Sequence, residues 1–212
     1  MEFQSLLIIA VGAIFISNFV LERFLGICPY IGVSQKLHAA FGMGMAVIFV
    51  MSMASVVTWT IYTYLLKPST TNIIYRLIMK GQGSPPDLTY LRTITFILVI
   101  ATLVQFVEMV IQKTSPGLNR TLGIYLPLIT TNCAILGVSI LNIESGYGFI
   151  ESLVNGFASG IGFTLALILM AGLREKLELT NVPRAMRGAP IAFILAGCMS
   201  LAFLGFTGLK IG

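Results

Sequence analysis

The sequence has few charged residues: Asp, Glu, Lys and Arg together make up 10% of its 212 residues. A soluble domain usually carries about 25% charged residues, so this shortage excludes an ordinary soluble domain. Hydrophobic residues make up 57% of the chain, and its mean hydropathy is +0.94. These values predict an all-α integral membrane protein, because lipid cannot satisfy the backbone groups at an open sheet edge.

Residues that form disulfides or bind metals are scarce as well. The chain has three cysteines and a single histidine, His38, which we expect at the membrane interface. Three cysteines do not make a disulfide framework. The sequence also lacks a Gly-rich phosphate loop and a dinucleotide fingerprint, so no nucleotide site is expected on this chain. Its basic residues form no dense run, and nucleic acid is therefore not an expected partner.

Charged residues divide the sequence into six apolar segments, each of about the length that a helix needs to cross a bilayer. The segments run from about Phe3 to Leu25, Ala39 to Leu66, Thr93 to Ile111, Thr121 to Ile143, Ser152 to Leu173 and Gly188 to Leu209. The longest connection follows the second segment. Within it, residues 72–80 are predicted to form a short amphipathic helix on the membrane surface.

The first and fourth segments are predicted to be broken helices. Pro29 follows Cys28, and proline disfavours helix in the residue before it, so we expect the first break at Cys28. The fourth segment contains Pro127 and then three polar residues, 130–132, in the middle of an apolar stretch. Such residues can hydrogen-bond backbone groups that a broken helix frees, which predicts a second break before Cys133.

One short phrase occurs in both halves of the chain. Residues 28–34 and residues 133–139 both fit Cys-x-x-x-Gly-Val-Ser. We therefore predict one membrane domain, 1–212, built from a first repeat of about 1–112 and a second of about 113–212. Three crossings per half is an odd number, so the second half enters the membrane from the opposite side. In this inverted repeat, Cys28 and Cys133 should approach each other near mid-membrane.

The two repeated cysteines are candidate metal ligands. Thiolates are soft ligands that select iron–sulfur clusters, zinc and copper(I), and a binuclear iron–sulfur cluster commonly needs four cysteines. Cys28 and Cys133 supply two, so a partner would have to supply the others. Packing and a transient disulfide remain alternatives for this pair. Cys198 has no counterpart in the first half and is expected to serve packing.

Other polar residues lie within apolar segments. Glu108 either pairs with Lys113 at the interface or binds a translocated proton or sodium ion. Asn18 and Asn132 are expected to hydrogen-bond the ends of the broken helices. The connections that would lie on one side of the membrane carry more Lys and Arg than those on the other, which favours both termini outside.

Several stretches resemble a known family of membrane subunits. They are residues 24–34, 93–100, 105–109, 113–116, 122–138 and 199–208, with the run Pro-Leu-Ile-Thr-Thr-Asn-Cys at 127–133 the most specific. The family comprises the A-type and E-type subunits of the Rnf complex and the D-type and E-type subunits of the sodium-pumping NADH:quinone oxidoreductase. Cys-Pro followed by Gly-Val-Ser is most similar to the A branch of Rnf. The connection from Lys67 to Tyr90 is longer than is usual in this family.

This resemblance implies a function and a set of partners. It implies a subunit of an ion-translocating (sodium or proton) ferredoxin:NAD+ oxidoreductase, with no site of its own for NAD or ferredoxin, in a bacterial or archaeal cytoplasmic membrane. A similar E-type subunit, inverted relative to this one, would share a [2Fe-2S] cluster with it. Cys28 and Cys133 would be two of the ligands, and the Rnf subunits B, C, D and G would complete the complex.

Two other functions remain open on the sequence. Inverted repeats with broken helices also occur in secondary transporters of small ions or metabolites, although the sequence shows no charged substrate pocket. A purely structural assembly subunit would tolerate alanine at both repeated cysteines.

Overall fold

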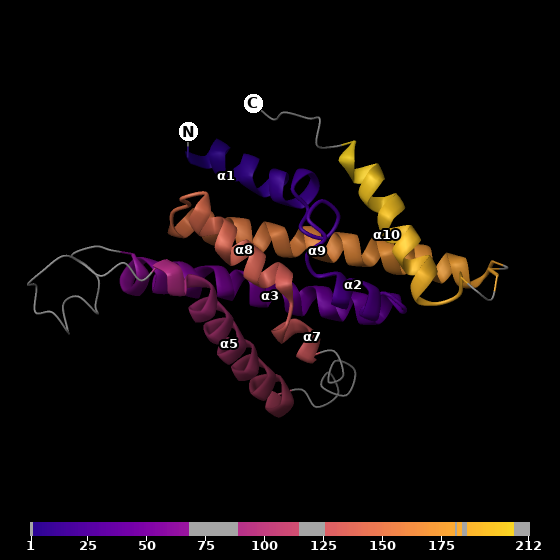
Figure 1. Ribbon diagram of the computed structural model, residues 1–212, viewed down its shortest axis with the longest axis horizontal. Helices are drawn as coiled ribbons and strands as arrows, with labels where there is room; N and C mark the ends of the chain where they lie inside the picture. The colour runs from indigo at the N-terminus through magenta and orange to yellow at the C-terminus, as the bar shows by residue number, and fades with distance from the viewer. Residues whose placement is uncertain (1, 68–88, 115–125, 181, 184–185, 206–212) are drawn as a thin grey trace, which may run out of the picture.

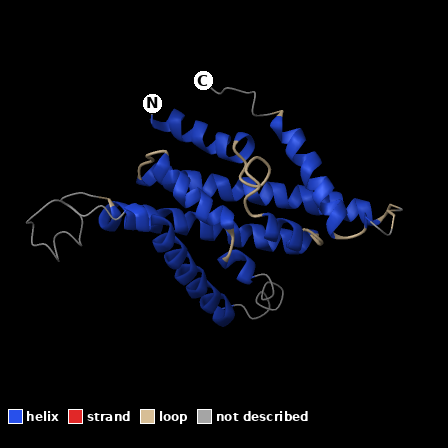
Figure 2. Cartoon of the chain, in the orientation of Figure 1, coloured by secondary structure: helices blue, strands red, loops and turns tan. Residues whose placement is uncertain are grey.

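The computed structural model describes residues 2–67, 89–114, 126–180, 182–183 and 186–205, and within these ranges regular structure is helical, without a strand (Figure 2). The α-helices, in chain order, are α1 (Glu2–Val11), α2 (Ile27–Val33), α3 (Leu37–Ile61), α5 (Arg92–Thr114), α7 (Leu126–Thr130), α8 (Cys133–Glu144), α9 (Phe149–Glu178) and α10 (Ala189–Leu204). The expected all-α class is confirmed. The surface helix expected at residues 72–80 lies outside the described residues.

Four helical stretches are long and apolar enough to cross a membrane. They are Leu37–Leu66, Thr89–Met109, Pro127–Glu144 and Phe149–Glu178. Two further apolar helices, Gln4–Ile16 and Ala189–Leu204, are shorter. At a rise of about 1.5 Å per residue they span roughly 20–24 Å, less than the hydrocarbon core of about 30 Å. The membrane fold therefore agrees with the sequence, while the count of six crossings stays a prediction.

Helices α3 and α9 form the centre of the structure, where they lie side by side and run in opposite directions (Figure 1). Small residues let their backbones approach closely. A Cβ atom at Gly160 would lie 2.8 Å from Cα of Ile48, and one at Gly156 would overlap Ser55. Small residues at helix interfaces are the usual means of tight packing in membranes, where the hydrophobic effect does not drive helices together.

The outer helices lie on opposite sides of this central pair (Figure 1). α5 contacts α3, α7 and α8, whereas α10 contacts α9, α2 and η1 (Gly12–Ile16), a π-helical turn that extends α1. The two sets of neighbours can be paired. The long helix α3 would correspond to α9, the short helix α8 to α2, and the short helix α7 to η1. This matching supports the predicted division into two repeats, which remains a prediction.

The first helix breaks upstream of the expected place. After η1, residues 17–26 are not helical, and α2 then begins with Cys28 in its first turn. The expectation of a non-helical Cys28 was therefore wrong. Pro29 is tolerated because the first turn of a helix needs no intrahelical hydrogen bond from its N–H groups. The break is instead marked by Phe24 and Gly26, which have φ values of 54° and 83°.

The fourth apolar segment breaks where the sequence predicts it. α7 ends at Thr130, and α8 begins at Cys133. Thr131 and Asn132 form the interruption. The second cysteine of the repeated phrase is thus the first residue of its helix.

Candidate functional site

The two breaks meet. The backbone N–H of Gly26 donates a hydrogen bond to Sγ of Cys133 across 3.0 Å. Gly26 directly precedes α2 and lies two residues before Cys28. The structure therefore joins the residue before α2 to the first residue of the second copy of the phrase. A direct approach of Cys28 to Cys133 stays a prediction.

Gly26 can be replaced by no other residue without strain at this contact. Its φ of 83° lies in the left-handed region, which residues with a side chain rarely adopt. A Cβ atom there would lie 2.7 Å from Cε2 of Phe163 on α9 and 3.0 Å from Oδ1 of Asn132. Only glycine lets the first break approach the second this closely.

Asn132 fixes the start of α8. Its Oδ1 accepts a hydrogen bond of 3.0 Å from the N–H of Ala134, which satisfies one of the donors left free at a helix N-terminus. The side chain is 4% exposed. Its Nδ2 donor has no hydrogen-bond partner among the described residues, so an amide donor remains available beside Cys133.

Asn18 fixes the first break to α9. Its Nδ2 donates to the carbonyl oxygen of Gly162 at 2.8 Å and to that of Ile14 at 3.2 Å. Its Oδ1 accepts from the N–H groups of Val20 and Leu21. Both asparagines therefore hydrogen-bond broken helix ends, which confirms that expectation.

The thiols of Cys28 and Cys133 are exposed and form no disulfide. An exposed thiol in an apolar segment faces lipid or a partner, which suits a ligand shared between chains better than a packing role. Within the described residues, no group of three or more His, Cys, Asp or Glu side chains is arranged to hold a metal ion. The described part of the chain therefore offers the thiols of Cys28 and Cys133 as metal ligands near this contact. Cys198 on α10 is also exposed, so it does not pack in the core of this chain, and its packing role stays a prediction.

The surroundings of Cys133 suit an anionic sulfur ligand. Cys133 is the first residue of α8, and the N-terminus of a helix carries a partial positive charge that favours anions. The Gly26 amide already points at the sulfur, and the free Asn132 amide lies one residue away. A thiolate-held iron–sulfur cluster, whose properties depend on hydrogen bonds to sulfur, fits this donor set.

The other candidate residues lie on helices that do not carry the two cysteines. Glu108 is half-buried on α5, and Lys113 is exposed near the end of the same helix. His38 is exposed at the start of α3, which agrees with an interfacial position. The cysteine contact is therefore built without these three residues, because it is formed by the starts of α2 and α8.

Arg174 holds the far end of α2, although the sequence presents it only as a charge that sets topology. From α9 it donates to the carbonyl oxygen of Ile31 at 2.7 Å and to Oγ of Ser34 at 2.9 Å. Both acceptors belong to the first copy of the phrase, at the end of α2. A cation there also interacts favourably with the partial negative charge of a helix C-terminus. No pattern in the sequence singles out Arg174, because Ser139, the counterpart of Ser34, bonds within its own helix.

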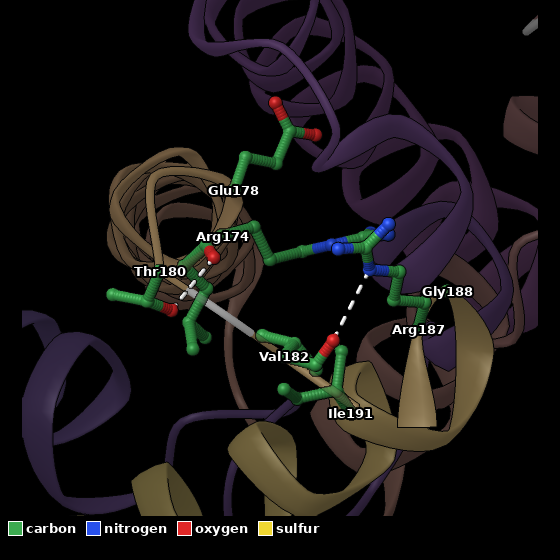
Figure 3. A pocket seen from close by; sticks show the side chains of 8 residues that line it. Arg174, Glu178, Thr180, Val182, Arg187, Gly188 and Ile191 are labelled. Atoms are coloured by element: carbon green, nitrogen blue, oxygen red, sulfur yellow. Dashed lines mark hydrogen bonds between the residues drawn. The ribbon is translucent and has the colours of Figure 1, made fainter. Parts of the chain in front are cut away.

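A charged cavity of about 330 Å³ lies at the end of α9. Figure 3 shows Arg174 and Arg187 extending toward it, with the Arg187 Nε–H donating to the Val182 carbonyl oxygen at 3.2 Å. Its lining comes from the last turns of α9, the connection that follows and the start of α10. The cavity is therefore at helix ends, not between the two breaks where a transporter of this architecture would bind substrate.

Residues 6–210 match a family described as Rnf-Nqr subunit, membrane protein. A relative from Acetobacterium woodii, the A-type subunit of the Na(+)-translocating ferredoxin:NAD(+) oxidoreductase complex, is 51% identical over 99% of this chain and 100% of its own length. The A-type subunit of the ion-translocating oxidoreductase complex of Syntrophotalea carbinolica is 54% identical over the same shares. Its counterpart from Serratia proteamaculans is 54% identical over 96% of each chain.

The match covers both breaks and nearly the whole length of the relatives, which are subunits of ion-translocating oxidoreductase complexes. The chain belongs to the Rnf-Nqr family of membrane subunits.

Proposed function

We propose that this chain is a membrane subunit of an ion-translocating ferredoxin:NAD+ oxidoreductase complex that relays electrons through an intramembrane [2Fe-2S] cluster shared with a homologous subunit. The observation that carries this proposal is the contact between the Gly26 amide and the Cys133 sulfur. It joins the break before the first copy of the phrase to the first residue of the second copy, and both cysteines are exposed.

Each residue at the contact has a role in this proposal. Cys28 and Cys133 would bind iron, and two cysteines of the partner would complete the usual set of four. The Gly26 N–H would hydrogen-bond a ligand sulfur, as it does here with the free thiol. Asn132 would hold the start of α8 and turn its free amide toward the site. When bound, such a cluster supplies a one-electron carrier inside the membrane.

The proposed partners and location rest on the resemblance to the Rnf subunits and on the charge of the loops. Their names describe subunits of complexes, and an E-type subunit in inverted orientation is the partner that the family resemblance implies. Subunits B, C, D and G would provide the sites for ferredoxin and NAD. We place the chain in the cytoplasmic membrane with both termini outside, because the loops on the other side carry more Lys and Arg.

The test is to replace each cysteine in the complete complex, purified without oxygen. Cys28→Ser and Cys133→Ser should each remove iron and abolish electron transfer from ferredoxin to NAD+. Cys198→Ser is the matched control, since Cys198 is also exposed but lies on α10, and this variant should retain iron and activity. Full iron content and activity in either phrase variant would refute the proposal.

A further inference from the structure

The cavity at the end of α9 combines two arginine side chains with apolar ones. Arg174 reaches it from α9, and Arg187 reaches it from the connection before α10 (Figure 3). Leu177, Val182 and Ile191 supply apolar lining. The volume of about 330 Å³ lies within the range of sites for small ligands. The cavity is therefore large enough for a small anionic group.

The positive charge of the two arginines is not neutralised by a neighbouring acid. Among the described residues, no carboxylate forms an ion pair with Arg174 or Arg187. Glu178 lines the same cavity, but its side chain is exposed and pairs with neither guanidinium. Like charges that line one small cavity repel each other unless an anion lies between them. The charge of this cavity therefore favours an anionic occupant.

Both guanidinium groups keep N–H donors for a ligand. Nη1 of Arg174 makes both hydrogen bonds to the end of α2, which leaves the N–H groups of Nε and Nη2. Arg187 donates from Nε to the Val182 carbonyl oxygen, which leaves both terminal nitrogens. Guanidinium groups bind phosphate through such pairs of parallel N–H groups. Phosphate is therefore the anion that this pair of arginines fits best.

The start of α10 adds partial positive charge at the same place. α10 begins at Ala189, and its N-cap residue, Gly188, has no side chain that could cap it. Gly188 lines the cavity, as does Ile191 in the first turn of α10. The N-terminus of a helix favours an anion. The helix end thus reinforces the two arginines, on which the site depends.

The position of the cavity indicates a membrane lipid as the source of the phosphate. α9 is long and apolar enough to cross a membrane, and Arg174 and Leu177 lie in its last two turns. Leu173 and Leu169, each 40% exposed, lie one and two turns before Leu177 on the same face of the helix. A lipid with its phosphate in the cavity would therefore lay an acyl chain along these leucines.

We propose that this cavity binds the phosphate of an anionic phospholipid, with Arg174 and Arg187 as its ligands and an acyl chain along Leu169 and Leu173. Basic pockets between helices on the cytoplasmic side are typical sites for anionic headgroups. The distribution of Lys and Arg favours that side for this end of α9. The inference goes beyond the proposed function and does not depend on the iron–sulfur cluster.

A bound phosphate would also restrain α2. Arg174 holds the carbonyl oxygen of Ile31 and the hydroxyl of Ser34 at the end of that helix. Because the same guanidinium would contact both the lipid and α2, lipid binding restricts the position of the helix that carries Cys28. A ligand that binds the folded state alone stabilises it. We therefore expect the lipid to raise the melting temperature.

The test titrates the complete complex, washed free of lipid with detergent, with mixed micelles of phosphatidylglycerol and follows its melting temperature. Arg187→Gln should raise the half-saturating phosphatidylglycerol concentration about tenfold, because it removes hydrogen bonds from a charged donor. Lys176→Gln is the matched control, since Lys176 is an exposed cation on α9 that does not line the cavity. It should leave the half-saturating concentration unchanged.

Each comparison either supports or overturns the site. Equal half-saturating concentrations in Arg187→Gln and Lys176→Gln would overturn it. An equal rise in melting temperature with phosphatidylcholine would overturn the preference for an anionic lipid, and a full rise with inorganic phosphate would overturn the lipid as its source. If Arg187→Gln does not assemble, Arg187→Lys gives the answer, because it keeps the charge but loses the planar pair of donors. An unchanged half-saturating concentration in that variant would also overturn the site.

Discussion

The amide nitrogen of Gly26 and the sulfur of Cys133 lie 3.0 Å apart, although 107 residues separate them in the chain. This single hydrogen bond joins the break in the first helix to the break in the second half. Phe163 of α9 packs against the same glycine. The contact therefore joins the two halves of the chain beside the central helix α9.

Gly26→Ala should destabilise the protein and separate the two breaks. The added Cβ would require a strained φ and displacement of Phe163, at a combined cost of about 2–3 kcal/mol. We expect a lower melting temperature and loss of iron from the complex. Gly172→Ala is the control: its Cβ would enter open space on α9, so stability should stay the same or rise by about 0.5–1 kcal/mol. Equal effects of the two changes would contradict this role of Gly26.

Asn132→Ala should weaken the start of α8. It removes the side chain that accepts from the Ala134 N–H, and loss of such a cap costs about 1 kcal/mol. Asn132→Ser should recover most of this loss, because serine is also a good cap. Thermal unfolding of the two variants in detergent gives the comparison. If serine is as destabilising as alanine, capping is not the role of this residue.

Arg174→Gln should loosen the end of α2. The guanidinium holds the Ile31 carbonyl oxygen and the Ser34 hydroxyl, and because Arg174 is only half-buried we expect a loss of about 1 kcal/mol. Iron retention during purification should fall in parallel. Lys176→Gln, two residues further on and exposed, should leave both properties unchanged. A similar loss in both variants would indicate a general charge effect.

Gly160→Ala should disturb the central helix pair. The new Cβ would lie 2.8 Å from backbone Cα of Ile48, which cannot move without shifting α3, so we expect a loss of about 1–3 kcal/mol. Gly197→Ala on α10 meets open space and serves as the control. The melting temperature of the solubilised protein measures the difference. A tolerant Gly160 would mean that α3 and α9 pack less tightly than the structure indicates.

Much of the fold follows from the sequence. Apolar stretches between charged residues predict the helices, and the polar run before Cys133 predicts the second break, because these local signals act within a few residues. The repeated phrase predicts that both cysteines reach one place. The first break was misplaced because proline disfavours the preceding residue in helix interiors but is accepted in a first turn, as at Cys28 and Pro29.

By itself, then, the sequence determined the all-helical membrane fold and the second break, since each depends on local pattern, and its repeated phrase predicts that the two copies meet. Only the tertiary structure decided which atoms touch: the Gly26 amide on the Cys133 sulfur, Arg174 on the end of α2, and the Asn155 amide on the Asn142 side-chain oxygen. These contacts join residues that are distant in the chain. Their geometry depends on how α3, α8 and α9 pack, which no local pattern specifies.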